Sequence, residues 1–172
     1  MEKGERFRWA VEILKVKPDD NILEIGCGVG FAVEEVAQHL VTGKITAIDK
    51  SPAMIEKAIR RNQRNIEQDK ARFIQSELLG FEENDVKYDK IFCFNVNLFW
   101  TGNSIDREIS VLKSILLRKG LVYIFYGPMP GGGFEKIASP VRKNLEKENL
   151  KVIDFVDEKR LKCCCFVVAL HA

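Results

Sequence analysis

The segment from Asn21 to Gly30, NILEIGCGVG, places a short apolar run directly before three glycines at alternate positions, Gly26, Gly28 and Gly30. This pattern is typical of a buried strand that runs into a tight turn and then into a helix. Glycine allows a positive φ and, because it lacks a Cβ, lets a ligand approach the main chain closely. The free N–H groups of the following helix favour a negatively charged or polar ligand group. A plain strand–helix connection also explains these glycines, so other segments must decide.

The size and charge of the chain narrow the function classes. Its 172 residues are close to one domain, since a domain has roughly 150 residues, and we expect a single domain over residues 1–172. A hydrophobic fraction of 46% with 30% charged residues is enough for a sizeable core. The net charge of +2 lacks the basic excess of a nucleic-acid-binding surface, so a nucleic-acid partner is disfavoured.

The sequence also predicts a compartment. No apolar run approaches the roughly 18 residues of a membrane span, and the first residues lack the apolar core of a secretion signal. The five cysteines are an odd number, and three of them are consecutive, from Cys163 to Cys165, so a disulfide framework is not expected. Alternate residues of a strand face opposite ways, so this run cannot form a zinc site and we expect it to pack in the core. We predict a reduced, cytoplasmic protein with no metal and no membrane contact.

Periodicity along the chain predicts five strands that alternate with helices, followed by two further strands. The expected strands cover residues 21–25, 44–49, 71–75, 88–95, 120–126, 151–155 and 163–170, and the expected helices cover 6–16, 31–40, 52–66, 104–116 and 134–148. The last two strands lie too close for a helical crossover and should pair as an antiparallel hairpin. The predicted fold is therefore α/β, with a doubly wound, mostly parallel seven-stranded sheet, a C-terminal antiparallel hairpin and helices on both faces.

Two helical segments allow a bland and a functional interpretation. The N-terminal helix, within residues 1–18, either packs on the core or forms a wall of a ligand site. The helix that starts at Ser51-Pro52, a serine cap followed by a first-turn proline, carries Arg60, Arg61 and Arg64 on its outer face. We interpret this arginine cluster as a solvated helix face rather than a binding patch.

Polar residues follow several of the predicted strands at their carboxyl ends, where a doubly wound sheet binds its ligands. Asp49 follows Gly26 by 23 residues, close to the spacing at which an acid reaches the ribose hydroxyls of a bound nucleoside. A dinucleotide turn would need glycine at position 31, where this chain has Phe31, and no phosphate-binding P-loop is present. The pattern indicates a nucleoside ligand without a pyrophosphate.

Four segments together resemble the class I S-adenosylmethionine-dependent methyltransferases, which have a Rossmann-like fold. Glu24-Ile-Gly-Cys-Gly-Val-Gly30 is similar to the first motif, [DE]-x-G-x-G-x-G, of that family. The segments Ala47–Ala58, Phe73–Leu79 and Tyr88–Trp100 resemble its second, third and fourth strand motifs, and the likeness extends from about residue 22 to 126. The predicted hairpin also fits the fold of the family.

The resemblance implies S-adenosylmethionine as cofactor and assigns roles to particular residues. The methionine part would lie over Glu24 and the glycine turn, the ribose on Asp49, the adenine amine on Glu77 and the amino-acid end near Asn95. The further cofactor contacts implied by the motifs are Gly26, Cys27, Gly28, Gly30, Lys50, Met54, Ser76 and Leu78. This chain has Ser76-Glu77 where the family usually has Gly-Asp, and glutamate is one methylene longer than aspartate.

The implied reaction is in-line transfer of a methyl group from a sulfonium to an acceptor, for which a dry pocket and alignment supply most of the catalysis. No catalytic acid–base pair is required, and neither His39 nor His171 is placed for one. Asn97, Trp100 and Tyr126 lie near strand ends and are candidate acceptor contacts. The [DN]-P-P-[YF] motif of amino methylation is absent after the fourth strand, which disfavours adenine, cytosine or glutamine as acceptor.

The acceptor is left open by the sequence. Only the first helix and the loops at 95–104 and 127–133 could cover the pocket. Either the acceptor is small, or the site is open to RNA or protein, or a second subunit of a homodimer completes it, and the charge balance favours the small molecule. Two rival functions are an inactive cofactor-binding module and a nicotinamide-dependent oxidoreductase, and the glycine spacing argues against the oxidoreductase.

Overall fold

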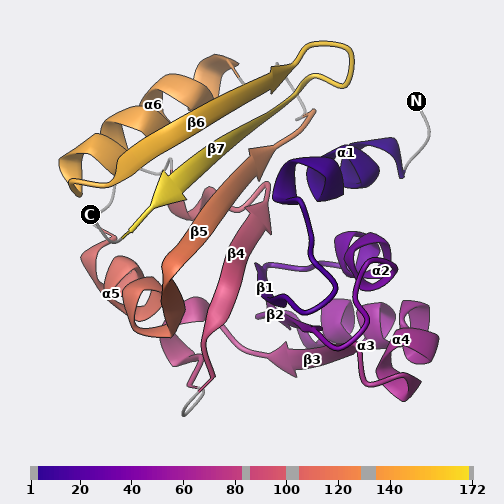
Figure 1. The fold of residues 1–172 in the computed structure, drawn as a ribbon. Helices are drawn as coiled ribbons and strands as arrows, with labels where there is room; N and C mark the ends of the chain where they lie inside the picture. The colour runs from indigo at the N-terminus through magenta and orange to yellow at the C-terminus, as the bar shows by residue number, and fades with distance from the viewer. Residues whose placement is uncertain (1–3, 83–85, 100–104, 129–134, 171–172) are drawn as a thin grey trace.

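The computed structural model describes residues 4–82, 86–99, 105–128 and 135–170, and its centre is one mixed β-sheet (Figure 1). The strands are β1 (Asn21–Ile25), β2 (Lys44–Asp49), β3 (Ala71–Gln75), β4 (Tyr88–Phe94), β5 (Leu116–Tyr126), β6 (Lys151–Glu158) and β7 (Cys163–Ala169). Their order across the seven-stranded sheet is β3-β2-β1-β4-β5-β7-β6. β7 is antiparallel to both of its neighbours, whereas the pairs from β3 to β5 are parallel. The predicted sheet and hairpin are confirmed.

Helices cover both faces of this sheet, as predicted (Figure 1). The helices are α1 (Glu5–Leu14), α2 (Phe31–Ala37), α3 (Pro52–Arg61), α4 (Gln63–Glu67), α5 (Asp106–Ile115) and α6 (Glu135–Lys147), with short 3-10 turns η1 (Leu78–Gly80) and η2 (Asn97–Phe99). The first three helices contribute to one apolar cluster, and α5 and α6 contribute to a second cluster on the opposite face. Because the winding reverses direction between β1 and β4, the carboxyl ends of these two strands flank the crevice where a doubly wound sheet binds ligands.

The single helix predicted over residues 52–66 is wrong, because the chain breaks at Asn62 into α3 and α4. Asn62 is fully buried, and its Nδ2 donates to the carbonyl oxygen of Ala58 at 3.1 Å and to that of Gly30 at 3.0 Å. A buried asparagine side chain that bonds to backbone carbonyls competes with regular helix geometry. The tertiary contact with the glycine turn therefore decides where α3 ends.

The start of β5 also differs from the prediction of a strand at residue 120. β5 begins at Leu116, directly after α5. Gly120 lies where the strand passes the backbone of β4, and a Cβ at this position would lie 2.9 Å from the Asp89 carbonyl oxygen. The glycine therefore permits a close approach inside a longer strand rather than marking its beginning.

The consecutive cysteines of β7 alternate between the two faces of the sheet. Cys163 and Cys165 belong to one apolar cluster, and Cys164 belongs to the other. All three are fully buried and form no disulfide. This placement confirms the predicted packing role, since successive side chains of a strand point to opposite faces.

Candidate functional site

Two of the glycines after β1, Gly28 and Gly30, have different structural roles, although both belong to the same sequence motif. Gly28 has φ +54°, and a Cβ on it would meet no atom within 4 Å, so its main chain faces open space. Gly30 has φ +77°, but a Cβ there would lie 2.7 Å from Asn62 Nδ2 and 3.2 Å from the Ala58 Cα. Gly28 is thus the position where a ligand can approach the backbone, and Gly30 allows α3 to pack against the turn.

The glycine turn is held by side chains that the sequence did not single out for this role. Asn62 donates to the Gly30 carbonyl oxygen. Arg61 stacks its guanidinium carbon 3.6 Å from the centroid of the Phe31 ring and donates from Nε to the Val29 carbonyl oxygen at 3.1 Å. The solvated-face interpretation fits Arg60, which forms an exposed ion pair with Glu56, but it is incomplete for Arg61. No local sequence pattern predicts these contacts, because they join residues about thirty positions apart.

The Asp49 carboxylate, at the carboxyl end of β2, is fixed in orientation by two backbone donors. Its Oδ2 accepts from the Gly28 N–H at 2.9 Å, and its Oδ1 accepts from the Ser51 N–H at 2.9 Å. Each carboxylate oxygen has a further lone pair, so both can still accept from a ligand hydroxyl. The side chain is half-buried at the rim of the crevice. The arrangement suits a pair of neighbouring hydroxyls.

Glu24, near the end of β1, is a buried acid with one unpaired oxygen. It is 2% exposed, and its Oε2 has no hydrogen-bond partner among the residues that the structure describes. Burial, followed by the nearby charge of Asp49, raises the pKa of Glu24 well above its ordinary value. A buried polar atom left unpaired is destabilising, and such atoms are few in native structures. Glu24 is therefore a candidate ligand contact.

A cavity of about 410 Å³ opens at the carboxyl ends of β1 and β2, within the size range of small-molecule sites. It brings together seven of the predicted contacts: Gly26, Asp49, Lys50, Ser76, Glu77, Leu78 and Asn97. The lining also includes Ile25, Ile48, Leu79, Val96, Leu98 and Glu108, which the sequence analysis did not select. Glu108 comes from the first turn of α5, and only the tertiary fold brings that helix to the crevice.

The other predicted residues lie around this cavity rather than in its lining. Met54 is half-buried in the first turn of α3, and its N–H donates to Ser51 Oγ at 3.4 Å. Asn95 has φ +56°, and its Oδ1 accepts from the Gly127 N–H at 2.8 Å, so this side chain ties β4 to β5. Ligand contacts by both residues stay predictions.

Tyr126 and Trp100 were predicted to contact an acceptor. Tyr126 is fully buried, and its hydroxyl donates to the carbonyl oxygen of Val96 at 3.3 Å. Val96 lies against the glycine turn, since a Cβ on Gly26 would be 2.8 Å from its Cγ2. Tyr126 thus supports the wall of the crevice from behind, and a direct acceptor contact stays a prediction. Trp100 lies outside the described residues.

The thiols nearest the crevice are kept neutral. Burial raises the pKa values of Cys27 and Cys93 far above the ordinary thiol value, with a further contribution from the charge of Glu24. The thiolate is the nucleophilic form of cysteine, so neither residue supplies a nucleophile. Within the part of the chain that the structure describes, no group of three or more His, Cys, Asp or Glu side chains is arranged to hold a metal ion.

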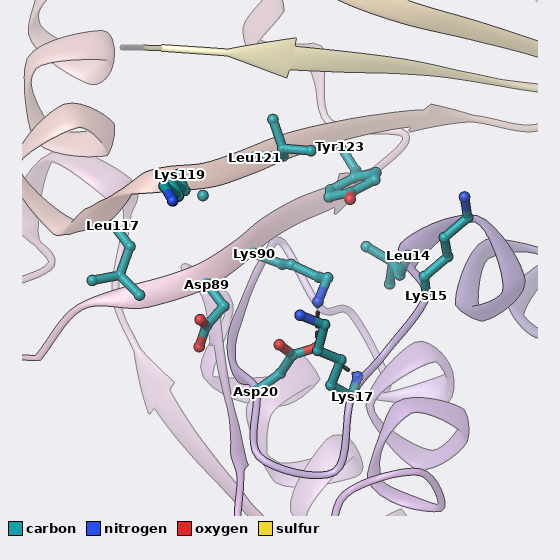
Figure 2. A pocket seen from close by; sticks show the side chains of 11 residues that line it. Leu14, Lys15, Lys17, Asp20, Asp89, Lys90, Leu117, Lys119, Leu121 and Tyr123 are labelled. Carbon is teal, nitrogen blue, oxygen red and sulfur yellow. Dashed lines mark hydrogen bonds and ion pairs between the residues drawn. The ribbon is translucent and has the colours of Figure 1, made fainter.

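A second cavity, of about 290 Å³, lies at the opposite edge of the sheet, where β4 and β5 begin (Figure 2). Lys90 and Asp20 form a buried ion pair in its wall, and Asp20 Oδ2 also accepts from the Lys17 N–H at 2.6 Å. Asp89, which lines the same cavity, accepts from the Asn21 N–H at 2.9 Å. Both aspartates therefore have structural partners that attach the start of β1 to β4.

Comparison with known proteins shows to which family the chain belongs. A family model described as a methyltransferase domain matches residues 22–120. An uncharacterized methyltransferase from Bacillus subtilis (strain 168) is 24% identical over 144 residues, which cover 84% of this chain and 70% of that protein. A trans-aconitate 2-methyltransferase from Enterobacter sp. (strain 638) is 31% identical over 116 residues, covering 64% of this chain and 43% of that protein. Against two further relatives the chain spans 44% and 24% of their length.

The same fold is present in solved structures. A SAM-dependent methyltransferase from Aquifex aeolicus superposes with a TM-score of 0.75 at 17% identity, and the match covers 98% of each chain. No helix among the described residues is long and apolar enough to span a membrane. Because the family model covers more than half of the sequence, including the glycine turn, Asp49 and Glu77, this chain belongs to the methyltransferase domain family.

Proposed function

We propose that this protein is an S-adenosylmethionine-dependent methyltransferase that acts on a small-molecule acceptor. The observation that carries the proposal is the arrangement at the carboxyl ends of β1 and β2. There the main chain at Gly28 faces open space, the Asp49 carboxylate accepts from the Gly28 N–H and lines the cavity, and Glu24 Oε2 is buried without a hydrogen-bond partner among the described residues. Such a constellation offers separate contacts for a ribose, a nucleobase and a polar amino-acid end.

The residues present fit this cofactor. Asp49 would accept from the two ribose hydroxyls, since both of its oxygens keep a free lone pair. Glu77 and Leu78 line the part of the cavity beside β3, where they would contact the adenine. Glu24, with its unpaired Oε2, would meet the methionine portion, whose positive groups would favour the ionised carboxylate.

Methyl transfer from a sulfonium requires few catalytic groups from the protein. The bound donor supplies an electrophilic methyl group on a sulfonium. The apolar lining from Ile25, Val96 and Leu98 would exclude water, and the fixed turn would hold the reacting centres in line. Among the described residues, His39 follows α2 at the amino-terminal edge of the sheet and is exposed, so it is remote from the crevice. An acceptor whose attacking atom is already deprotonated, such as a carboxylate oxygen, needs no histidine base.

The charge of the chain supports a small acceptor. The net charge of +2 gives no nucleic-acid footprint. The Enterobacter relative is named for trans-aconitate, which makes small organic acids the first acceptors to screen.

Calorimetric titration with S-adenosylhomocysteine and with NAD tests the proposal. We expect binding of S-adenosylhomocysteine and none of NAD at millimolar concentration, and the reverse result would refute the proposed donor. A methyl-transfer screen with small acids, phenols, amines and thiols, with RNA and protein in parallel, tests the acceptor class. Transfer to RNA or protein alone would exclude a small-molecule acceptor.

A further inference from the structure

Arg6, in the first turn of α1, has no acidic partner in the part of the chain that the structure describes. Its guanidinium carbon lies 4.7 Å from the centroid of the Phe7 ring and 5.4 Å from that of Phe94. Its Nε is buried and has no hydrogen-bond acceptor. The adjacent acid, Glu5, is already paired with Arg160 in the β6–β7 connection. A buried donor without an acceptor calls for an explanation, and a ligand is one.

The position of Arg6 points to the crevice rather than to an unrelated surface. Phe94 is the last residue of β4, and its ring packs edge-on against the Phe7 ring with the ring centroids 5.3 Å apart. Phe7 in turn stacks on Phe31, the first residue after the glycine turn, with the ring centroids 5.7 Å apart. Arg6 therefore lies at the carboxyl ends of the strands, between β4 and the turn, and Figure 1 shows α1 beside the tip of β4.

The chemistry of this arginine selects a carboxylate. A guanidinium presents a planar set of N–H donors that matches a carboxylate in a bidentate geometry. The two aromatic rings limit the motion of the side chain, and the residue as a whole is only half-buried. The rings cannot accept in the way that an oxygen does, so the buried Nε stays unpaired without a ligand.

We propose that Arg6 binds a carboxylate group at the mouth of the crevice. The inference rests on the proposed function, because that function places two ligands here. The carboxylate belongs either to the amino-acid end of the donor or to the acceptor, and two arms of one experiment separate these sources.

The experiment compares the parent protein with Arg6→Gln by calorimetry. The first arm measures S-adenosylhomocysteine against 5′-methylthioadenosine, which has the same nucleoside but no amino-acid end. The second arm titrates succinate and trans-aconitate into the complex with S-adenosylhomocysteine. Arg118→Gln is the matched control, since it removes the same charge from an exposed position at the start of β5. Arg6→Lys keeps the charge without the bidentate donor geometry.

If the donor supplies the carboxylate, Arg6→Gln weakens S-adenosylhomocysteine by roughly 10- to 100-fold, the range of a lost charged hydrogen bond, and leaves 5′-methylthioadenosine unchanged. If the acceptor supplies it, only the carboxylate titration is weakened. In either case Arg6→Lys has an intermediate affinity and Arg118→Gln matches the parent.

A folded Arg6→Gln protein whose affinities equal those of the parent in both arms overturns the inference. A lower melting temperature with unchanged affinities also overturns it, because that result assigns Arg6 a packing role. A parent protein that fails to bind S-adenosylhomocysteine counts instead against the proposed function.

Discussion

Lys90 and Asp20 are buried together at the amino-terminal edge of the sheet, whereas Glu24 is buried near the carboxyl-terminal edge with an unpaired Oε2. At the first edge, Asp20 accepts from the Lys17 N–H before β1 and Asp89 accepts from the Asn21 N–H at its start, so their charges stabilise the fold. At the second edge, Glu24 Oε2 and Arg6 Nε have no hydrogen-bond partner in the part of the chain that the structure describes. From this difference we infer that paired charges hold the first edge together and that the unpaired atoms of the second edge are ligand contacts.

The largest expected effect comes from removing one partner of the buried ion pair between Asp20 and Lys90. Asp20→Ala leaves Lys90 buried with no carboxylate, and removing one partner of a buried pair costs about 3–5 kcal/mol. We expect this loss in urea unfolding, with no change in the affinity of the folded protein for S-adenosylhomocysteine. The double variant Asp20→Leu, Lys90→Met should recover most of the stability. A loss of affinity without a loss of stability would place this pair in a ligand site.

The next prediction compares Gly30→Ala with Gly28→Ala. It tests whether Gly30 serves packing and Gly28 serves ligand binding. Gly30→Ala forces a Cβ to within 2.7 Å of Asn62 Nδ2 at φ +77°, so we expect a loss of about 2–4 kcal/mol of stability. Gly28→Ala, with open space around its Cβ, should lose only about 1 kcal/mol from its positive φ but should weaken cofactor binding more than Gly30→Ala does. Urea unfolding and calorimetry on both variants measure the contrast. Equal stability losses would show that the two positions are not distinct.

Asp49→Ala should have the opposite profile to Asp20→Ala. Loss of the charged hydrogen bonds to the ribose weakens S-adenosylhomocysteine binding by about 1.5–3 kcal/mol. The folded structure loses only the bonds from Gly28 and Ser51, so the effect on unfolding is smaller than the effect on binding. Calorimetry on a variant with a normal circular dichroism spectrum measures it. An unchanged dissociation constant would remove Asp49 from the site.

The smallest expected effect is that of Glu24→Gln, which should stabilise the protein, whereas the substitutions above destabilise it. Its pKa is raised in the folded chain, so the folded state holds a proton at pH values where the unfolded chain has released it, and stability falls as the pH rises above the ordinary carboxyl value. Glu24→Gln removes this ionisation. We expect the ligand-free variant to be more stable than the parent at pH 7.5, with the difference vanishing toward pH 4. Destabilisation of the variant by the same amount at both pH values would contradict the prediction.

Much of the fold was predictable because its signals are local. The strand from Asn21 to Ile25 ends in glycines, and the serine cap and proline at positions 51 and 52 begin α3 as expected. The helix break at Asn62 was not predictable, since the side chain bonds to Gly30, which is 32 residues away. The true start of β5 depends likewise on the backbone of a neighbouring strand.

The sequence by itself determined the sheet, the glycine turn and the acid at Asp49, because motif spacing fixes which residues follow neighbouring strands. Only the tertiary structure decided which glycine faces open space, and which acid and which arginine keep a buried polar atom unpaired among the described residues. Those properties depend on what the rest of the chain packs around each group, as Asn62 does at Gly30 and the aromatic rings do at Arg6. Burial and pairing are properties of the assembled fold, and they separate a structural charge from one kept for a ligand.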